Sequence, residues 1–230
     1  MSNFQKNNIV LSQRLLKCAE MITPGSKIAD IGTDHAYVPI YLALNKKITH
    51  AIAADLREGP IENAKQNIKF YGLDNIIETR LSDGLENISE NEADEILIAG
   101  LGGNIIINIL EKICWKNKRF IIQPMKYERR LREYMAKSGY ELISERAVIC
   151  LKKVYTVMEV IFTGEKYNIT PEEEYIGKIK PDTNDPASIA YVKKQIKDLE
   201  NHKKGAAACK LYDKEKYFQN IINNLLNTIN

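Results

Sequence analysis

The sequence predicts an α/β protein: a mostly parallel sheet with an antiparallel edge hairpin, followed by a C-terminal helical hairpin. Three observations predict this fold. From residue 26 to residue 138, short apolar runs alternate with helical segments, as parallel strands alternate with crossover helices. Two β-rich runs separated by Lys152 and Lys153 then indicate an antiparallel hairpin. Residues 186–230 carry apolar side chains at helical spacing.

The first predicted element is an amphipathic helix within residues 8–22, which we expect to cover one edge of the sheet. Thr23-Pro24-Gly25 ends it. The strands of the parallel part are expected at 27–31, 49–54, 76–80, 94–99 and 119–123, its helices at 37–44, 59–71, 104–113 and 127–138, and the hairpin strands at 141–151 and 154–162.

The composition changes after Thr163-Gly164, where a polar segment with three prolines and a run of three glutamates begins. We therefore divide the chain into a first domain of residues 1–164 and a helical domain of residues 165–230. Apolar stripes predict two helices that break at Lys203-Lys204-Gly205 and pack as a hairpin, as in an antiparallel coiled coil.

The bulk composition is that of a globular protein, with 44% hydrophobic and 27% charged residues in a chain of 230. Four widely separated cysteines indicate reduced thiols in the cytoplasm. Three scattered histidines suggest no metal site. The first eight residues lack the apolar core of a signal peptide, and no run reaches the roughly 18 apolar residues of a membrane span. We therefore expect no membrane and no metal partner.

The stretch SKIADIGTDHAYVPI at residues 26–40 predicts a ligand site, because it reads as a strand, a tight turn and a helix. Gly32 is its only glycine, so the G-x-G-x-x-G pattern of dinucleotide sites is absent. Asp30 and Asp34 disfavour a pyrophosphate and favour a cation or an amino-acid ammonium group. The alternative is an ordinary strand-to-helix turn capped by an aspartate.

Acidic residues also follow the next two predicted strands. Asp55 stands where nucleoside-binding sheets accept hydrogen bonds from ribose hydroxyls, although it could instead cap the next helix. Asp83 can accept from an exocyclic amine such as that of adenine, although Ser-Asp-Gly is also a turn signal. The glycines of residues 100–103 permit close approach to the backbone. No Lys-Ser or Lys-Thr pair follows them, which argues against a triphosphate.

Basic charge is concentrated in two segments, whereas the net charge of the chain is only +3. Seven basic residues and one acid lie between Lys116 and Arg132, and residues 185–217 hold eight lysines against five acids. Clustered cations suit a phosphate backbone. The alternative is a solvated helix face. Tyr127 and Tyr134 lie in or beside the first cluster, where they could stack on bases or simply pack.

Taken in order, the motifs KIADIGTDHAYVPIYL, AADLREGPIENAKQN, RLSDGL, EILIAGLGG, FIIQP and ERAVICLKKVYTVMEVIF resemble the bacterial tRNA (adenine-N1)-methyltransferase family that modifies adenine 22. The resemblance covers roughly residues 8–205. It implies a class I methyltransferase fold, which is Rossmann-like, with S-adenosylmethionine as methyl donor and S-adenosylhomocysteine as product. It also implies tRNA as the partner.

The resemblance also implies roles for particular residues. Asp55 would hold the donor's ribose, with Leu56 and Arg57 around its adenine, and Asp83 and Gly84 would meet the adenine amine. The first donor-binding motif would consist of Asp30, Gly32, Thr33, Asp34, His35 and Ala36. Further contacts would come from Gly100, Leu101, Gly102 and Gly103. These glycines replace the Asn/Asp-Pro-Pro-aromatic motif of amino-methyltransferases, which argues against methylation of an exocyclic amine.

The expected reaction is direct in-line attack by adenine N1, which has a lone pair and no proton. The candidate catalytic groups are Asp30, Asp34 and the carbonyls near Gly100, which would stabilise the developing positive charge. His35 would hydrogen-bond the target base or, alternatively, support the helix start. The expected tRNA-binding residues are Arg14, Gln123, Lys126, Arg129 and Arg130. We expect a monomer. The alternative functions are methylation of another RNA base or a small molecule, and a non-catalytic RNA-binding module.

Overall fold

The structure is a computed structural model that describes residues 9–229; the predictions made for residues 1–8 lie outside that range. Its helices and strands follow the predicted alternation closely. In chain order they are α1 (Gln13–Met21), β1 (Ser26–Ile31), α2 (Tyr37–Leu44), β2 (Ile48–Asp55), α3 (Glu58–Tyr71), β3 (Ile77–Leu81), the 3-10 turn η1 (Glu90–Glu92), β4 (Glu95–Leu101), α4 (Gly103–Leu110), β5 (Arg119–Pro124), α5 (Glu128–Ser138), β6 (Tyr140–Cys150), β7 (Lys153–Phe162), α6 (Pro171–Ile176), α7 (Pro186–Ala208) and α8 (Tyr212–Ile229).

The seven strands form one sheet in the order β3-β2-β1-β4-β5-β7-β6. Strands β1 to β5 are parallel, and β7 pairs antiparallel with both β5 and β6. The strand order reverses between β1 and β4, and open α/β sheets bind ligands at such a reversal, beyond the carboxyl ends of the strands. The predicted fold class is confirmed, and the sheet brings the ends of β1, β2 and β4 together.

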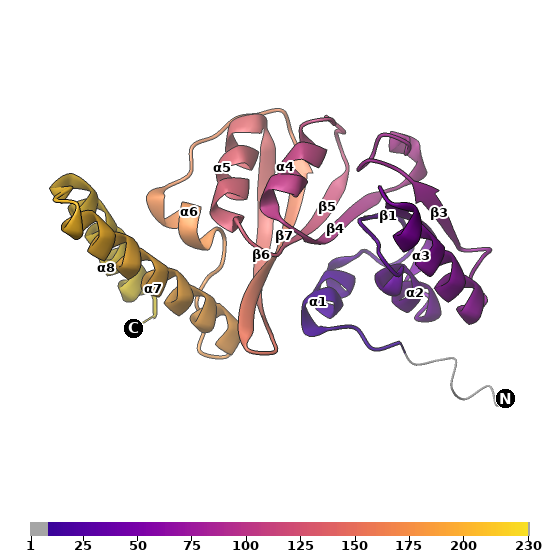
Figure 1. The fold of residues 1–230 in the computed structure, drawn as a ribbon, viewed down its shortest axis with the longest axis horizontal. Helices are drawn as coiled ribbons and strands as arrows, with labels where there is room; N and C mark the ends of the chain where they lie inside the picture. The colour runs from indigo at the N-terminus through magenta and orange to yellow at the C-terminus, as the bar shows by residue number, and fades with distance from the viewer. Residues whose placement is uncertain (1–8, 230) are drawn as a thin grey trace.

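Helices cover both faces of the sheet (Figure 1). On one face α4 and α5 pack over the core that contains Phe120, Ile122 and Leu131. On the other face α1, α2 and α3 pack over Ile28 and Ile121. The predicted first helix, α1, packs on the face of the sheet at its β6 edge. Its apolar stripe lies near β5, β7 and the edge strand β6, which present an apolar surface that α2 and α3 do not reach.

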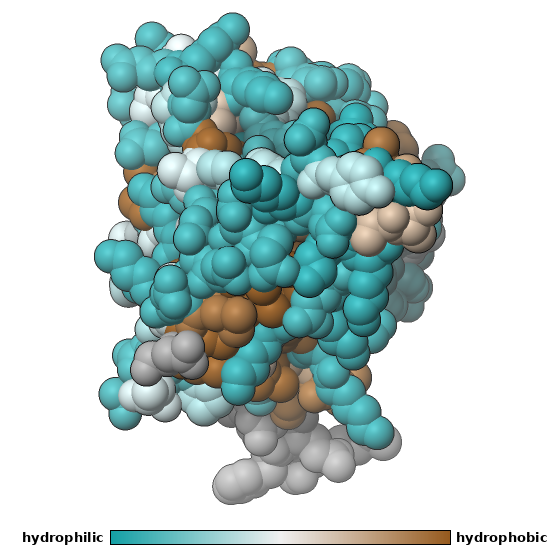
Figure 2. All heavy atoms as spheres, turned by 90° about the vertical axis from the view of Figure 1, so that its left-hand side faces the viewer, coloured by the Kyte–Doolittle hydropathy of each residue, from teal (hydrophilic) through white to brown (hydrophobic). Residues whose placement is uncertain are grey.

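The C-terminal helices α7 and α8 pack along each other and extend away from the sheet (Figure 1). The predicted break at Lys203-Lys204-Gly205 was wrong, because α7 continues through it to Ala208. One glycine in a helix costs only about 1 kcal/mol, and α7 packs along α8 with Ala206 buried just beyond this segment. The chain turns instead at Lys210, which adopts a positive φ of 57°. The outer face of this part is largely hydrophilic (Figure 2).

A short helix that the sequence analysis missed, α6, joins the two parts. Thr170 caps it, and the Thr170 and Glu173 side chains bond each other's backbone in a capping box. Tyr175 and Ile176 of α6 pack with α7 and α8 in an apolar cluster separate from the sheet cores. This separate cluster is consistent with a division at residues 164 and 165, which stays a prediction.

A buried ion pair fastens this C-terminal part to the sheet. Arg132 of α5 meets Glu145 of β6 at 2.6 Å, with only 2% of the arginine residue exposed. The same guanidinium donates to the Tyr191 hydroxyl of α7 at 2.7 Å and to the carbonyls of Glu174 and Tyr175. The side chain of Arg132 therefore links α5, β6, α6 and α7.

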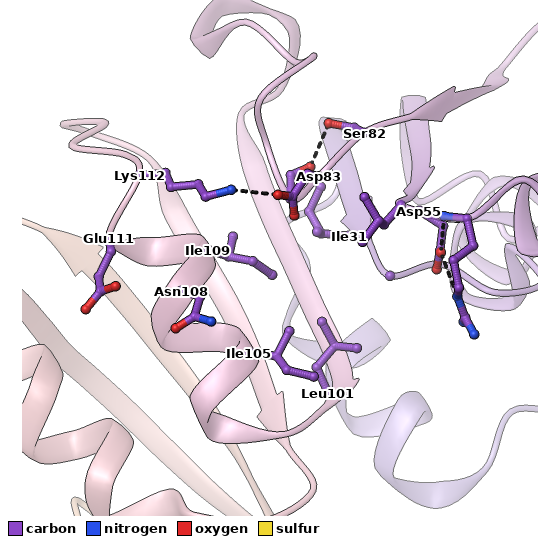
Figure 3. A pocket seen from close by; sticks show the side chains of 14 residues that line it. Ile31, Asp55, Ser82, Asp83, Leu101, Ile105, Asn108, Ile109, Glu111 and Lys112 are labelled. Atoms are coloured by element: carbon purple, nitrogen blue, oxygen red, sulfur yellow. Dashed lines mark hydrogen bonds and ion pairs between the residues drawn. The ribbon is translucent and has the colours of Figure 1, made fainter.

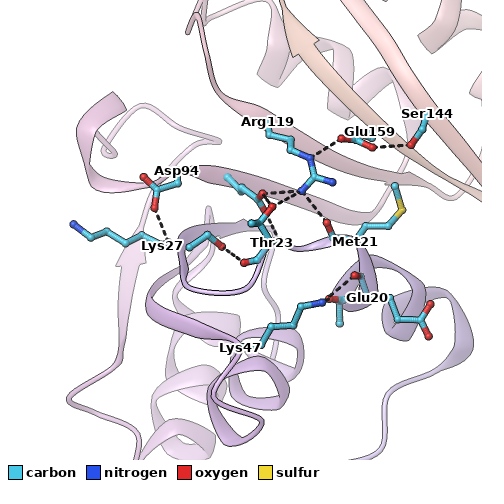
Figure 4. A network of polar contacts seen from close by, with 12 residues as sticks. Glu20, Met21, Thr23, Lys27, Lys47, Asp94, Arg119, Ser144 and Glu159 are labelled. Carbon is cyan, nitrogen blue, oxygen red and sulfur yellow. Dashed lines mark hydrogen bonds and ion pairs between the residues drawn. The ribbon is translucent and has the colours of Figure 1, made fainter.

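A second arginine of the predicted basic cluster is also structural. Arg119 of β5 pairs with Glu95 at 2.7 Å and Glu159 at 2.6 Å, and it donates to the Met21 carbonyl at the end of α1 (Figure 4). Glu95 also accepts from the backbone of Thr23. This network anchors the α1–β1 connection at the amino end of the parallel strands, opposite the edge that carries the acids.

Candidate functional site

Two adjoining cavities lie beyond the carboxyl ends of β1, β2 and β4. The first has a volume of about 780 Å³ and the second about 510 Å³. Both are lined by Gly32, Asp55, Arg57 and Leu101, so they form one continuous cleft. The turn after β1, which the sequence singled out as a ligand site, lies at the junction of the two cavities.

Asp55 ends β2 inside this cleft and is 7% exposed. Its Oδ1 accepts from the backbone N–H of Arg57 at 2.9 Å, so the carboxylate both shapes the turn and remains at the cavity wall. Oδ2 has no hydrogen-bond partner within residues 9–229. A buried carboxylate with one oxygen left to accept is suited to a pair of neighbouring hydroxyls.

Asp83 lies across the first cavity from Asp55, in the loop after β3 (Figure 3). Its Oδ2 accepts from Lys112 at 2.7 Å, and Lys112 also reaches Glu86 at 2.6 Å. Ser82 is buried and donates from its hydroxyl to the Gly84 carbonyl, which tightens the turn that presents Asp83. Ile31 lies between the two acids, and Leu101, Ile105 and Ile109 extend the apolar wall toward α4. The cavity thus combines a flat apolar wall with acceptors at two sides.

Sequence reasoning missed the α4 face of this cavity. Ile105, Asn108, Ile109 and Lys112 line it at spacings of three, one and three. These are the spacings of one helical face. The helical spacing of these residues could be seen in the sequence after Gly103. An apolar helix face, however, is more often buried against a sheet than exposed to a ligand.

Asp30 faces the second cavity from the end of β1 and is 5% exposed. Its Oδ2 accepts from the Thr33 hydroxyl at 2.7 Å. Burial raises the pKa of the Asp30 carboxyl from 3.8 to about 6, with a further raising effect from the charge of Asp55 and an opposing effect from the Thr33 hydrogen bond. At neutral pH Asp30 therefore carries a buried negative charge that has no ion-pair partner within residues 9–229, although Arg14 and Arg57 also line this cavity.

The buried charge of Asp30 lowers the stability of the folded protein, which leads to a prediction for Asp30→Asn. Because the folded carboxyl has the higher pKa, its ionisation disfavours the folded state, and stability falls as the pH rises from about 4 to about 6. The variant keeps an acceptor for Thr33 and is expected to gain roughly 2–3 kcal/mol of unfolding free energy at pH 8. Urea unfolding at pH 8 and at pH 5 measures this, and the gain is expected to be about half as large at pH 5. An equal gain at both pH values would contradict the assignment.

The turn between β1 and α2 is tightly wound. Asp34 and Ala36 both have positive φ, 49° and 56°, although neither is glycine. The His35 ring between them stacks on the Tyr37 ring at 5.0 Å, and its Nε2 lies 3.5 Å from Asp34 Oδ2. Such a conformation persists only where the surroundings enforce it, and it is commonest at functional sites. Asp34 and His35 line the second cavity, whereas Ala36 is fully buried behind them.

The glycine turn after β4 forms the opposite wall. Gly100 has a φ of 84° and lies beside the Arg14 guanidinium. At Gly103 a Cβ atom would lie 2.9 Å from the carbonyl oxygens of both Lys126 and Tyr127. The Gly103 N–H donates to that Lys126 carbonyl at 3.0 Å. The glycines therefore bring the loop after β5 against the turn after β4, while Gly102 and Gly103 themselves line neither cavity.

Of the predicted tRNA-binding residues, Arg14 lines the second cavity. Its Nη1 donates to Gln123 Oε1 at 2.8 Å, and Gln123 Nε2 donates to the Pro124 carbonyl at 2.7 Å. Gln123 is completely buried. It therefore positions Arg14 rather than facing a ligand.

The predicted basic surface is smaller than the residue count suggests. Arg129 pairs with Glu174 at 2.8 Å and lies over the Tyr175 ring, so it ties α5 to α6. Lys126 lies over the Tyr127 ring, 5.1 Å from its centroid, next to Gly102. Arg130 is exposed and has no ion-pair partner within residues 9–229. On this surface Lys126 and Arg130 are the predicted residues that remain available to a substrate, in addition to Arg14 in the second cavity.

No helix in residues 9–229 is long and apolar enough to cross a membrane. Within the same part of the chain, no three His, Cys, Asp or Glu side chains gather as metal ligands would.

Comparison with known proteins identifies similar sequences and folds. The family model described as a methyltransferase domain matches residues 11–158. The tRNA (adenine(22)-N(1))-methyltransferase of Bacillus subtilis is 45% identical over 143 residues. That alignment spans 60% of this chain and 60% of the length of the relative.

Solved structures extend the similarity over the C-terminal helices. The crystal structure of the B. subtilis m1A22 tRNA methyltransferase TrmK has a TM-score of 0.81 at 29% identity, covering 97% of this chain and 100% of that one. The structure of M. capricolum TrmK in complex with S-adenosylhomocysteine has a TM-score of 0.80 at 29% identity, covering 96% and 100%.

Proposed function

Since the chain belongs to the family of methyltransferase domains, we propose that it transfers a methyl group from S-adenosylmethionine to N1 of adenine 22 in tRNA. The relative from B. subtilis bears this activity in its name. One observation of the structure carries the proposal. Asp30, Asp55 and Asp83 line two adjoining cavities that share Leu101, so three acceptors surround one apolar wall.

The residues present fit this donor, which has a nucleoside at one end and an amino acid at the other. Asp55 would hold the ribose hydroxyls, and Asp83 would accept from the adenine amine. Asp30 would hold the ammonium group, because its buried charge has no cationic partner within residues 9–229. The apolar strip along Ile105 and Ile109 matches an adenine ring, and the cleft lacks the glycine pattern of a pyrophosphate site.

The bound donor supplies an electrophilic methyl group on a sulfonium. The protein does not have to remove a proton from the substrate, because adenine N1 carries a lone pair and no hydrogen. Its contribution is to hold the two reactants in line, which can supply several kcal/mol. A carboxylate in the second cavity would stabilise the positive charge that develops on the base. Asp30 and Asp34 line this cavity, as does His35, which could hydrogen-bond the base.

The decisive experiment is transfer of labelled methyl from S-adenosylmethionine to unmodified tRNA, followed by nucleoside analysis. We expect 1-methyladenosine that disappears when adenine 22 is replaced. Methylation at another position would retain the donor and change the substrate assignment. Donor binding without any transfer to tRNA would favour a small-molecule acceptor, and tRNA binding without donor binding would favour a non-catalytic RNA-binding module.

A polyanionic substrate also predicts a strong salt dependence. We expect tRNA affinity to fall about tenfold or more between about 50 and 200 mM salt, because phosphate contacts release counterions. Lys126→Ala and Arg130→Ala should each weaken binding and flatten this dependence. Lys69→Ala, an exposed lysine at the far end of α3, is the matched control. Filter binding measures all three, and an affinity that ignores salt would remove these cations from the interface.

We further propose that the protein acts as a cytoplasmic monomer. Light scattering of the purified protein, alone and with tRNA, measures the number of copies directly.

A further inference from the structure

The tip of the β6–β7 hairpin exposes an apolar side chain. Cys150 pairs with Lys153, which leaves Leu151 and Lys152 as a two-residue turn. Leu151 is 95% exposed, more than any other large apolar residue of the part of the chain described. A leucine at this position contributes nothing to the core of the protein.

The backbone at the tip is unfavourable for leucine. Leu151 has a φ of 57°, in the left-handed region that glycine and asparagine enter readily and bulky side chains rarely adopt. Glycine would form this turn with less strain. The fold thus maintains an exposed leucine where the turn favours another residue, and such outliers are commonest where the side chain has a function.

The hairpin carries Leu151 to the side of the sheet where the site lies. Ile122 of β5 pairs with Met158 of β7, so a continued register would set Pro124 opposite Thr156. β7 begins three residues earlier, at Lys153. At about 3.3 Å per residue, the hairpin therefore extends about 10 Å beyond the carboxyl end of β5.

A groove of about 670 Å³ connects the tip to the loop after β5. Its apolar lining includes Met125, Ile149 and Leu151. Met125 directly precedes Lys126, whose side chain lies beside Gly102 of the glycine turn. The tip, the groove and the catalytic cleft therefore follow one another along a continuous surface.

The charge of this surface identifies its partner. Lys152, Lys153 and Lys194 line the groove together with one acid, Glu128. Glu128 lies 3.7 Å from Lys194, which leaves the two tip lysines without a counter-charge among the described residues. An exposed apolar side chain followed by two lysines is complementary to a nucleic acid, whose phosphates pair with cations and whose stacked bases admit an apolar wedge.

We propose that Leu151 is a positioning residue that inserts into the base stack of the tRNA and fills the space left when the target adenine turns into the cleft. This inference rests on the proposed function. A base inside a folded RNA must leave its stack before its N1 can reach a buried donor. An inserted side chain holds the stack open, and Lys152 and Lys153 hold the adjacent phosphates.

The test uses tRNA with 2-aminopurine at position 22, whose fluorescence rises when the base leaves the stack. Wild-type protein should raise the signal, and Leu151→Gly should raise it much less. With unmodified tRNA, Leu151→Gly should lower kcat at least about tenfold with little change in KM, because unstacking is the step affected. Leu151→Met, of similar volume, should retain both signal and rate. Thermal unfolding should show Leu151→Gly to be at least as stable as wild type, since glycine tolerates the positive φ.

Three results would overturn the inference: an unchanged signal and rate in Leu151→Gly, an increase in KM alone, or an equal loss in Leu151→Met. In each of these cases the wild-type protein still methylates tRNA, so the proposed function stands. If wild-type protein neither raises the signal nor methylates the tRNA, the proposed function fails as well.

Discussion

Asp55→Ala is expected to lower the affinity for S-adenosylmethionine at least about 100-fold, because two charge-assisted hydrogen bonds of about 1.5 kcal/mol each would be lost. The carboxylate is buried at the junction of the two cavities. Asp55→Asn separates two roles of the residue. Its amide oxygen can still accept from the Arg57 N–H, so the turn after β2 should stay intact. Because the ribose would meet an uncharged amide, the variant should lose most of the affinity for S-adenosylmethionine that Asp55→Ala loses.

Calorimetric titration with S-adenosylmethionine measures both variants. Asp74→Asn is the matched control, because Asp74 is exposed in the loop before β3, at the opposite end of the strands. Its affinity should equal that of wild type. Unchanged donor affinity in Asp55→Ala would remove Asp55 from the donor site.

Arg132→Ala is expected to lower the free energy of unfolding by about 3–5 kcal/mol, because it leaves the Glu145 carboxylate buried without a counter-charge. Glu145 would retain Thr156 and the Lys178 N–H as donors, but neither carries a charge at the bonding atom. Gly177 packs so closely against this pair that a Cβ there would lie 1.8 Å from Glu145 Oε2. The site therefore cannot relax toward solvent without moving α6.

Urea unfolding measures the loss, with Arg129→Ala as control on the same helix. Arg129 pairs with Glu174 on the surface, where an ion pair contributes about 0–1 kcal/mol. The double variant Arg132→Met with Glu145→Leu should recover much of the lost stability, since it removes both charges. Equal effects of Arg129→Ala and Arg132→Ala would contradict the structural role assigned to the buried pair.

The sequence predicted the strands and the acids at their ends because both depend on local signals. A strand buried on both faces reads as an apolar run, and an acid that directly follows it lies at the ligand edge by the geometry of a parallel sheet. Asp30, Asp55 and Asp83 could therefore be placed before any coordinates were known. The sites that we propose for the adenine and the target base depend on residues of α4 and of the hairpin tip, whose local sequence does not show which cavity they line.

Counting charges overestimated the basic surface for a related reason. Arg119, Arg129 and Arg132 look identical to Lys126 in a count of basic residues, but each has an acidic partner on another element, between 13 and 45 positions away. Ion pairs between distant segments become visible only when the fold is known. At Gly205 the local sequence predicted the end of a helix, but α7 continues through it because it packs on α8.

The hydrogen bond between Arg14 and Gln123 spans 109 positions of the chain. This separation affects the order in which the site can form while the protein is being synthesised. A ribosome adding about 5–20 residues per second makes Gln123 about 5–20 seconds after Arg14. Strand β4 ends at Leu101, 22 residues before Gln123, so β1 gains this sheet neighbour before Arg14 gains its hydrogen-bond partner. The nascent chain thus displays its acids early but can close around a methyl donor only after β4 and β5 have left the ribosome.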